Sequence, residues 1–349
     1  MDAETLDIED RAALERYLSS NFAPAEEFAI REFEVLAGGV SSRTVRVLLA
    51  GGQEWVLKQA LAKLRVAADW FSDPRRVHRE ALGMRVLAEL TPPGSIPQLI
   101  FDDERHHVLA MEAVPKPHEN WKTMLLAGEE WEPHYLQFGK LLAAIHGNSW
   151  RRRDELRSAF DDTSFFESLR LEPYYQYSAT QEPRAAEFLR RLVEETRSSR
   201  WTLVHGDYSP KNVLVFEHRL VLLDHEVIHW GDPAFDVGFA LTHLLSKHHH
   251  LHRSGPRRPG MTDIPVTWFH RGYAANLGDM PWYEDFKSRC ARHTLGCLLA
   301  RVVGRSPLEY LTSDERHRQR EAVVRLIQDV PRDVPELIAR FIREIESQE

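Results

Sequence analysis

Three oxygen-bearing side chains, spaced along one stretch of the chain, have the chemistry needed to support phosphoryl transfer. Asp207 closes the tripeptide His205-Gly206-Asp207, Asn212 follows five positions later, and Asp224 follows twelve positions after Asn212. Phosphoryl transfer from a nucleotide needs a carboxylate that orients the attacking hydroxyl and oxygen ligands that hold Mg²⁺ on the phosphates. Because Mg²⁺ prefers carboxylate and amide oxygens, we predict Asp207 as the catalytic carboxylate and Asn212 and Asp224 as metal ligands.

Two further carboxylates follow in the same stretch. Glu226 lies two residues after Asp224, and residues i and i+2 of an extended segment point to the same side, so Glu226 is predicted as an additional metal ligand. Asp232 and Pro233 predict a helix start, since a carboxylate N-cap followed by proline is favoured there. The alternative is a β-hairpin whose acidic residues only cap turns, but the combination of motifs favours the chemical interpretation.

The bulk properties are those of a globular chain. It has 349 residues, of which 43% are hydrophobic and 28% charged, and this length allows one large bilobal unit or two domains. The net charge of −8 argues against a general nucleic-acid binder. No apolar run is long enough for a membrane span, and the acidic start MDAETLDIED is not typical of a signal peptide, so we expect a cytoplasmic protein without a membrane partner.

The two cysteines are expected to be free thiols. Cys290 and Cys297 are seven positions apart in a segment with helical character. Seven helical residues separate their Cα atoms by about 10 Å, beyond the roughly 7 Å that a disulfide can bridge. This agrees with a reducing cytoplasm.

The hydrophobic pattern predicts mixed α and β structure. Apolar spacing predicts a leading helix over residues 9–20, alternating strands from Phe28 onward, a helix over 74–90 and a helix over 133–147 that ends at Gly147 as a C-terminal cap. From about residue 265 to 347 the chain is predicted to be helical with proline punctuation.

The catalytic stretch resembles the aminoglycoside phosphotransferase/choline kinase branch of the protein-kinase-like fold. The residues that carry the resemblance are His205-Gly206-Asp207, Asn212, Asp224 and the segment Gly231-Asp232-Pro233-Ala234-Phe235-Asp236. The resemblance implies an α+β bilobal fold. Residues 1–113 would form a nucleotide-binding lobe with a small antiparallel sheet and one long helix, and residues 114–349 a larger, mainly helical catalytic and substrate-binding lobe. ATP and Mg²⁺ are the implied cofactors.

The same resemblance assigns a phosphate-covering hairpin to the turn that contains Gly38, Gly39, Ser41 and Ser42. Glycines let backbone N–H groups approach a phosphate closely, and serine hydroxyls add donors. The alternative for such a stretch is an ordinary hairpin turn.

Lys58 lies in the strand-like segment 54–60, where the resemblance implies that it grips the α- and β-phosphates. The family fixes this lysine with a carboxylate from the following helix, and Glu80 is the predicted partner, with Glu89 as a second candidate. Arg75 and Arg76, at the start of that helix, are predicted to be surface charges.

Further roles are implied by the resemblance alone. The backbone groups of Glu112 and Val114 would bond the adenine edge at the hinge between the lobes. Asp236 would brace the catalytic loop, and His205 and Asp232 would support it.

A narrower resemblance to methylthioribose kinases is patchy. It rests on Lys58-Gln59-Ala60-Leu61, on the Asp224-x-Glu226 pair and on Arg301-Val302-Val303-Gly304. Ala300 stands where those enzymes have a second arginine, so Arg301 is a candidate substrate residue and equally a residue of the core edge. The His-rich tract 248–252 is interpreted as a helix end rather than a metal site.

The sequence therefore predicts a Mg²⁺- and ATP-dependent kinase that phosphorylates a hydroxyl of a sugar, amino alcohol or aminoglycoside. A nucleotide-binding pseudokinase that serves as an interaction module and a methylthioribose-like sugar kinase are the alternatives. A protein kinase is disfavoured because Asp224-His225-Glu226 replaces the DFG segment. The choice between ATP and GTP and the oligomeric state stay open at this stage.

Overall fold

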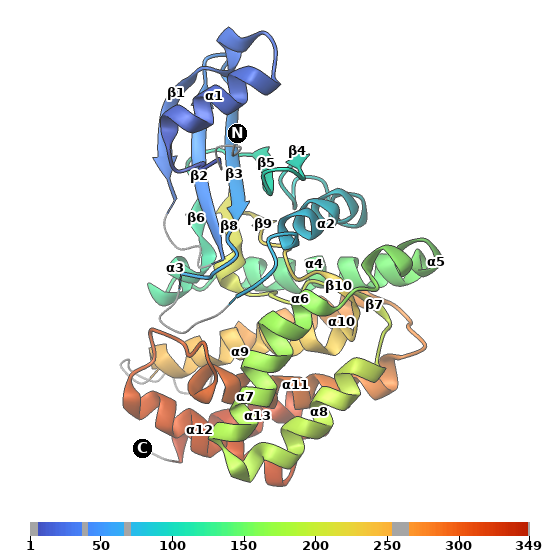
Figure 1. Cartoon of the computed structure of the whole chain (residues 1–349). Helices are drawn as coiled ribbons and strands as arrows, with labels where there is room; N and C mark the ends of the chain where they lie inside the picture. The colour runs from blue at the N-terminus through green and yellow to red at the C-terminus, as the bar shows by residue number, and fades with distance from the viewer. Residues whose placement is uncertain (1–5, 37–40, 66–70, 253–264, 348–349) are drawn as a thin grey trace. The chain divides into compact units, whose positions relative to one another are not determined.

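The computed structural model describes residues 6–36, 41–65, 71–252 and 265–347, and the chain divides into two compact units (Figure 1). The first unit comprises Met1–Glu89, Ile96–Lys116 and Asp224–Glu226. The second unit comprises Leu90–Ser95, Pro117–Leu223 and Val227–Glu349. The segment that contains Asp224 is therefore built into the first unit, although it follows residues 205–212, which belong to the second unit, in sequence.

An antiparallel sheet forms the centre of the first unit. Its strands follow the order β1-β2-β3-β5-β4, and β3 is the middle strand. The elements of this unit are α1 (Arg11–Asn21), η1 (Ala25–Phe28), β1 (Ile30–Val35), β2 (Ser42–Leu49), β3 (Glu54–Ala60), α2 (Arg76–Leu90), β4 (Leu99–Asp103) and β5 (Val108–Glu112). The predicted helices over 9–20 and 74–90 correspond to α1 and α2 within two residues at each end.

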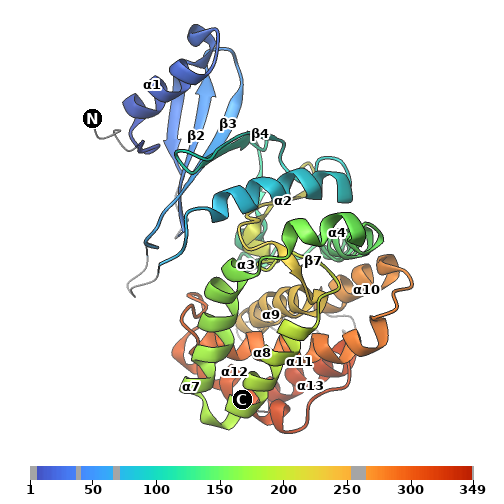
Figure 2. The same cartoon turned by 45° about the vertical axis from the view of Figure 1, so that its right-hand side comes forward.

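Helix α1 covers one face of this sheet (Figures 1 and 2). Leu14 and Leu18 of the helix are fully buried against Val45, Val47 and Leu57 of β2 and β3. Because side chains alternate across a strand, the residues next to Leu57 point to the opposite face. This alternation places Lys58 on the face that α1 does not cover.

The second unit is mainly helical. Its strands are short: β6 (Glu119–Asn120), β7 (Thr202–Val204), β8 (Val213–Phe216), β9 (Arg219–Leu222) and β10 (His229–Gly231). Its first helical elements are α3 (Trp121–Leu126), α4 (Glu132–Arg151), α5 (Arg153–Leu156), η2 (Ser158–Phe160), α6 (Ser164–Phe166), η3 (Glu167–Gln176), α7 (Tyr177–Gln181), η4 (Pro183–Ala185), α8 (Ala186–Ser198) and η5 (Pro210–Asn212). The later ones are α9 (Pro233–His252), α10 (Pro265–Leu277), α11 (Tyr283–Val303), α12 (Ser313–Gln328) and α13 (Val334–Glu346).

Helices α4 and α10 pack closely through glycines. A side chain at Gly139 would collide with the backbone of Phe269 and Tyr273, and one at Gly272 would collide with the backbone of Leu136. The prediction that Gly147 caps the C-terminus of its helix is wrong, because α4 continues to Arg151. The glycine instead lets α4 approach the carbonyl of Leu277 at the end of α10.

Both cysteines are buried and free on α11, as the sequence predicts.

Among the helices of the described ranges, none combines the length and apolar character needed to cross a membrane.

Two small antiparallel sheets frame the segment that carries Asp207. Strand β7 pairs with β10, and β8 pairs with both β6 and β9. The segment 205–212 connects β7 to β8, so its two ends are fixed by separate sheets. Helix α9 begins two residues after β10, which brings its first turn next to the same segment.

Candidate functional site

The catalytic loop, which we define as residues 205–212, turns sharply at Gly206. This residue has φ of +78°, a conformation that side-chain-bearing residues rarely adopt, and a Cβ there would lie 2.8 Å from Cγ2 of Val227. The next residues are anchored in the core, since Tyr208 stacks on Phe138 and its hydroxyl donates to the Phe138 carbonyl at 2.7 Å. The loop is therefore held rigidly on both sides of Asp207.

Asp236, in the first turn of α9, braces this loop from within the core. Its two carboxylate oxygens accept from the backbone N–H groups of His205 at 2.7 Å and Gly206 at 2.8 Å. His146 of α4 also contacts Asp236, with 3.3 Å between Nε2 and Oδ2, and its other ring nitrogen meets the Tyr273 hydroxyl at 2.9 Å. A fully buried carboxylate thus satisfies two loop donors that would otherwise lack a partner.

Asp207 is only 2% exposed and is surrounded by donors. Its Oδ2 lies 2.7 Å from the amide nitrogen of Asn212, 3.1 Å from Nη2 of Arg170 and 3.1 Å from Nζ of Lys211. The structure therefore brings together Asp207 and Asn212, two of the residues that the sequence singles out. Two cations hold the carboxylate of Asp207 in one orientation.

Arg170 is a site residue that the sequence analysis missed. Its Nε donates to the Gly206 carbonyl at 2.8 Å while Nη2 pairs with Asp207. It lies on η3, a π-helical segment in which Leu169 and Leu171 are buried. A lone arginine inside an apolar, aromatic-rich helix was the available signal, because such a charge is buried only when it is paired.

Lys58 stands between two carboxylates in the first unit. Its Nζ lies 2.7 Å and 2.8 Å from the two oxygens of Glu80 and 2.9 Å from Oδ1 of Asp224. Burial opposes the charged form of Lys58, but the attraction of Asp224 and Glu80 outweighs it and raises its pKa above the usual range. Burial raises the pKa of Glu80, and the charges of Asp224 and Glu226 add to this, so that it reaches about 7 despite Lys58.

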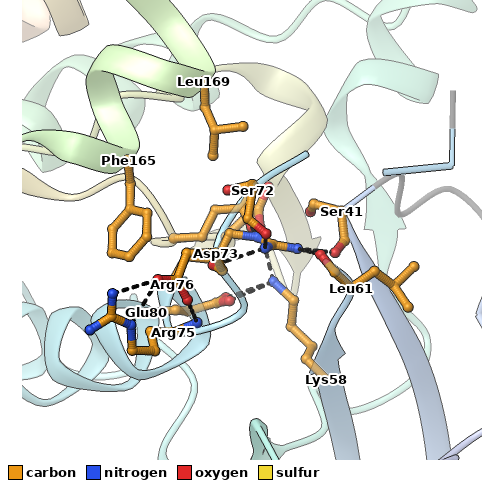
Figure 3. A network of polar contacts seen from close by, with 12 residues as sticks. Ser41, Lys58, Leu61, Ser72, Asp73, Arg75, Arg76, Glu80, Phe165 and Leu169 are labelled. Atoms are coloured by element: carbon orange, nitrogen blue, oxygen red, sulfur yellow. Dashed lines mark hydrogen bonds and ion pairs between the residues drawn. The ribbon is translucent and has the colours of Figure 1, made fainter. Parts of the chain in front are cut away.

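Arg76 is not a surface charge, so that prediction is wrong. The side chain is fully buried, whereas the neighbouring Arg75 is exposed and pairs with Asp73. Its Nε donates to Oε2 of Glu226 at 3.0 Å. The other nitrogens donate to four backbone carbonyls, those of Ser41, Leu61, Ser72 and Asp73 (Figure 3).

These contacts make Arg76 the centre of a network. Ser41 belongs to the predicted phosphate-covering turn, and Leu61 follows the strand that carries Lys58. Asp73 precedes the helix that carries Glu80, and Glu226 lies two residues after Asp224. One buried guanidinium therefore ties together four segments, each of which carries a predicted nucleotide or metal residue.

The segment 224–226 is not extended, contrary to the sequence interpretation. Asp224 has φ of +69°, so it lies in the left-handed region, and the strand β9 ends before it at Leu222. As a consequence the two carboxylates meet different cations: Asp224 meets Lys58 and Glu226 meets Arg76. Asp224 and Glu226 therefore do not lie on one side of a strand.

Asp232 caps α9 as the sequence predicts, with Oδ1 accepting from the Ala234 N–H at 3.0 Å. Its Oδ2 accepts from Nε of Arg289 on α11 at 2.8 Å. Burial alone would raise the pKa of Asp232, but His293 and Arg289 outweigh it and lower the pKa. Asp232 thus links the start of α9 to α11.

The structure describes some of the remaining residues that are predicted to bind the nucleotide. Gly38 and Gly39 lie outside the described residues, and Ser42, which begins β2, is buried. The backbone N–H of Glu112 donates to the Gln98 carbonyl at 2.9 Å at the end of β5, and Val114 follows in the connector to residue 117.

The residues present have donor atoms that fit a nucleotide and Mg²⁺. The amide nitrogen of Asn212 is used by Asp207, which leaves the amide oxygen to face a cation. The Asp224 side chain is 24% exposed and offers carboxylate oxygens, the donors that Mg²⁺ prefers. Within the described ranges no cluster of three or more His, Cys, Asp or Glu side chains forms a metal site.

Arg301 lies on α11 and is 7% exposed. Its Nη1 donates to the Tyr174 hydroxyl at 3.1 Å, to the Ser306 carbonyl and to the Ser306 hydroxyl. The residue is therefore anchored in the second unit, the unit that also contains Asp207.

Comparison with known proteins extends these observations. The family described as "Phosphotransferase enzyme family" matches residues 32–278. A methylthioribose kinase from Erwinia tasmaniensis is 25% identical over 354 residues, covering 84% of this chain and 87% of its own length.

Solved structures share the fold at low sequence identity. Amicoumacin kinase hAmiN, in complex with AMP-PNP, Ca²⁺ and Ami, has a TM-score of 0.56 and 13% identity, with 93% of this chain and 95% of that chain covered. A choline/ethanolamine kinase family protein from Mesorhizobium loti has a TM-score of 0.53 and 12% identity, with coverage of 97% and 99%.

These matches confirm the predicted α+β class, with a small antiparallel sheet, one long helix beside it and a larger, mainly helical part. The family match spans the sheet, Lys58, the catalytic loop and the start of α9. A match over this much of the chain shows that the protein belongs to the phosphotransferase enzyme family of small-molecule kinases.

Proposed function

We propose that this protein transfers the γ-phosphoryl group of ATP, in the presence of Mg²⁺, to a hydroxyl of a small molecule such as a sugar, an amino alcohol or an aminoglycoside. Residues 1–113 would bind the nucleotide, and residues 114–349 would bind the acceptor and supply the catalytic carboxylate. The observation that carries the proposal is the buried pair of Asp207 and Asn212 on a braced loop, with 2.7 Å between them.

Asp207 is assigned to the acceptor hydroxyl. A carboxylate that is held by Arg170 and Lys211 keeps one orientation, so it can accept a hydrogen bond from the attacking hydroxyl. The proton would pass to Asp207 late in the transfer, as the hydroxyl oxygen bonds to phosphorus. Asp236 and His205 contribute by holding the loop, and Asp232 by capping α9.

The nucleotide phosphates are assigned to Lys58, which Glu80 holds in place. Ser41, Ser42 and the preceding Gly38 and Gly39 would cover them, and the backbone of Glu112 and Val114 would meet the base. Asn212 and Asp224 would hold Mg²⁺, which when bound neutralises charge that develops on the phosphates. Glu226 is a further candidate ligand, and its pairing with Arg76 means that it would have to exchange one cation for another.

The test is phosphate transfer from ATP, and from GTP in parallel, to a panel of aminoglycosides, choline-like alcohols, pentoses and hydroxyl compounds that carry a carboxylate or phosphate group. We expect acceptor-dependent nucleotide consumption and a phosphorylated product with at least one class. Nucleotide binding without turnover on any acceptor would instead support the pseudokinase alternative.

Methylthioribose is a second candidate acceptor. The methylthioribose kinase of Erwinia tasmaniensis covers most of this chain at 25% identity, and the Asp224-x-Glu226 pair is present here. The single arginine at position 301, preceded by Ala300, is a difference from the paired arginines expected by the resemblance. Methylthioribose in the same panel, with product identified by mass, tests this candidate.

A further inference from the structure

Four basic side chains of the second unit form what we name the basic cluster: Lys122 of α3, His243 and Lys247 of α9, and Arg301 of α11. His243, Lys247 and Arg301 are buried, and the Lys122 side chain is 29% exposed. Nζ of Lys247 is 3.3 Å from the His243 carbonyl. Lys247 is 3% exposed and His243 is also 3% exposed. Burial lowers the pKa of His243 first, and the charges of Arg301, Lys247 and the neighbouring Lys211 lower it further, so these groups lie within electrostatic range of one another.

The negative charge that faces the cluster is small. Lys122 pairs with Glu309, and no other described carboxylate forms an ion pair with Lys122, Lys247 or Arg301. Lys247 instead lies over the Tyr310 ring, with Nζ 5.2 Å from its centroid. The nearby Glu315 is engaged by His250. Burial and the charges of Lys122 and Arg301 lower the pKa of Lys247 to about 7.

Such an excess of buried positive charge is costly unless an anion compensates it. A lysine amine can escape the cost by losing its proton, but a guanidinium cannot. Arg301 therefore remains charged, and the described residues around it provide hydroxyl and carbonyl contacts but no carboxylate bonded to it.

Arg301 presents one edge without a protein partner. All three of its hydrogen bonds involve Nη1. Its Nε is buried, and within the described ranges neither Nε nor Nη2 bonds an acceptor. Nε and Nη2 form the side of a guanidinium that can pair with two oxygens of one carboxylate or phosphate group.

The cluster is connected to the catalytic loop through Tyr174. The guanidinium carbon of Arg301 lies 5.6 Å from the centroid of the Tyr174 ring, and that of Arg170 lies 5.7 Å from the same centroid. Arg170 pairs with Asp207, as does Lys211, which is also within electrostatic range of His243. Arg301 and the catalytic carboxylate thus belong to one continuous set of contacts in the second unit.

We infer that the acceptor is an anion: a hydroxyl compound that also carries a carboxylate or phosphate group, which pairs with Arg301 and is neutralised by Lys247 and Lys122. This inference rests on the proposed function, since it names the class of molecule whose hydroxyl Asp207 would receive. It separates this protein from kinases of cationic acceptors such as aminoglycosides and choline, and it disfavours neutral methylthioribose.

The first experiment measures anion binding without any turnover. Inorganic sulfate, which stays a dianion from pH 6 to 8, is titrated against the thermal midpoint at ionic strength held constant with chloride. Because sulfate also stabilises proteins by exclusion from their surface, the readout is the difference between variants. Arg305→Gln is the matched control, since Arg305 is partly exposed and already paired with Glu172.

We expect sulfate to raise the thermal midpoint of the wild type and of Arg305→Gln up to a saturating value. In Arg301→Gln the sulfate concentration that gives half of this rise should be at least about tenfold higher, because a charge-assisted bidentate contact is lost. Lys247→Met is the second variant, in case Arg301→Gln does not fold, and the same change is expected. Lys58→Met tests whether sulfate binds instead at the predicted nucleotide-phosphate site. We expect this variant to keep the wild-type rise in thermal midpoint. An unchanged sulfate response in Arg301→Gln or Lys247→Met, or its loss in Lys58→Met, overturns the inference.

The second experiment separates this inference from the proposed function. Phosphate transfer from ATP is measured with matched acceptors: glycerate and gluconate, glycerol phosphate, and the uncharged glycerol, glucitol and methylthioribose. We expect transfer only to anionic acceptors, with kcat/KM lowered at least about tenfold by Arg301→Gln and unchanged by Arg305→Gln. Carboxylate and phosphate compounds are compared to identify which anion is preferred. Transfer to uncharged or cationic acceptors alone would refute the inference and leave the kinase proposal standing. Sulfate binding that depends on Arg301, without transfer to any acceptor, would refute the kinase proposal and show an anion site that is not an acceptor site.

Discussion

Arg76 and Glu226 form a buried ion pair, with 3.0 Å between Nε and Oε2, although 150 residues separate them in sequence. Both belong to the first unit, and the pair fixes the short segment that carries Asp224. Lys58 then contacts Asp224 from the strand side, so the segment is held by two cations. This arrangement explains how a residue that follows the catalytic loop in sequence becomes part of the sheet-containing unit.

We predict that Arg76→Met destabilises the fold far more than Arg75→Met. Removing the guanidinium leaves Glu226 buried without its cation and four carbonyls without a donor, and breaking a buried pair costs about 3–5 kcal/mol. Arg75 is exposed, so its loss should cost about 0–1 kcal/mol. Urea unfolding measures both. A double-mutant cycle with Glu226→Gln should give a coupling of at least about 1 kcal/mol, and additive effects would contradict the pairing.

Glu80 should make stability fall as the pH rises. Its pKa is about 7 in the folded protein and near 4.5 in the unfolded chain, so between these values the folded state holds the extra proton. Its contribution is therefore fully present below pH 4.5 and is lost as the pH rises through 7, a change on the order of 3 kcal/mol.

The measurement is urea unfolding at pH 5 and pH 8. We expect the free energy of unfolding to decrease less between pH 5 and pH 8 in Glu80→Gln than in the wild type. Glu89→Gln changes an exposed position on the same helix and should behave like the wild type. If the free energy of unfolding of Glu80→Gln decreased between the two pH values as much as that of the wild type, Glu80 would not titrate in this range.

Asp236→Asn should loosen the catalytic loop. Both oxygens of Asp236 accept backbone N–H groups, and an amide can accept only one of them, so one buried donor loses its partner at a cost of about 1–3 kcal/mol. Asp10→Asn is the control, because Asp10 also accepts two backbone N–H groups at an exposed helix start where asparagine is an equivalent cap. Equal stabilities of the two variants would argue against the bracing role.

Arg170→Gln should slow phosphate transfer without weakening nucleotide binding. The variant keeps a donor near Gly206 but removes one of the two cations on Asp207, so we expect kcat to fall by about 10- to 100-fold, which corresponds to about 1.4–2.7 kcal/mol. Arg197→Gln, an exposed arginine paired with Glu167, is the matched control. An altered nucleotide affinity with unchanged kcat would contradict the assignment of Arg170 to the catalytic carboxylate.

Local chemistry made several features predictable from the sequence. The cap at Asp232 follows from a carboxylate before proline, and the long helix after β3 follows from apolar spacing. The pairing of Lys58 with Glu80 was anticipated through the family resemblance, and the structure places them 2.7 Å apart. In these cases the relevant residues lie within one element or in two that follow each other along the chain.

Features that depend on tertiary packing were not predictable. Arg75 and Arg76 look alike in sequence, and only the docking of α2 decides that one is exposed and the other buried. The left-handed backbone of Asp224 has no signal in its side chain, so the extended interpretation placed Glu226 wrongly. Arg170 reaches Asp207 from a π-helical segment, whose spacing the usual helical periodicity does not describe.

The most direct test of the proposed function compares Asp207→Asn with the wild type in single-turnover phosphate transfer from ATP, with nucleotide affinity measured on the same samples. Asparagine keeps the size of the side chain and removes its ability to accept a proton. We predict a loss of at least about 100-fold in transfer rate with nucleotide affinity changed less than about threefold. Transfer at the wild-type rate by a folded Asp207→Asn protein would contradict the central role of this carboxylate.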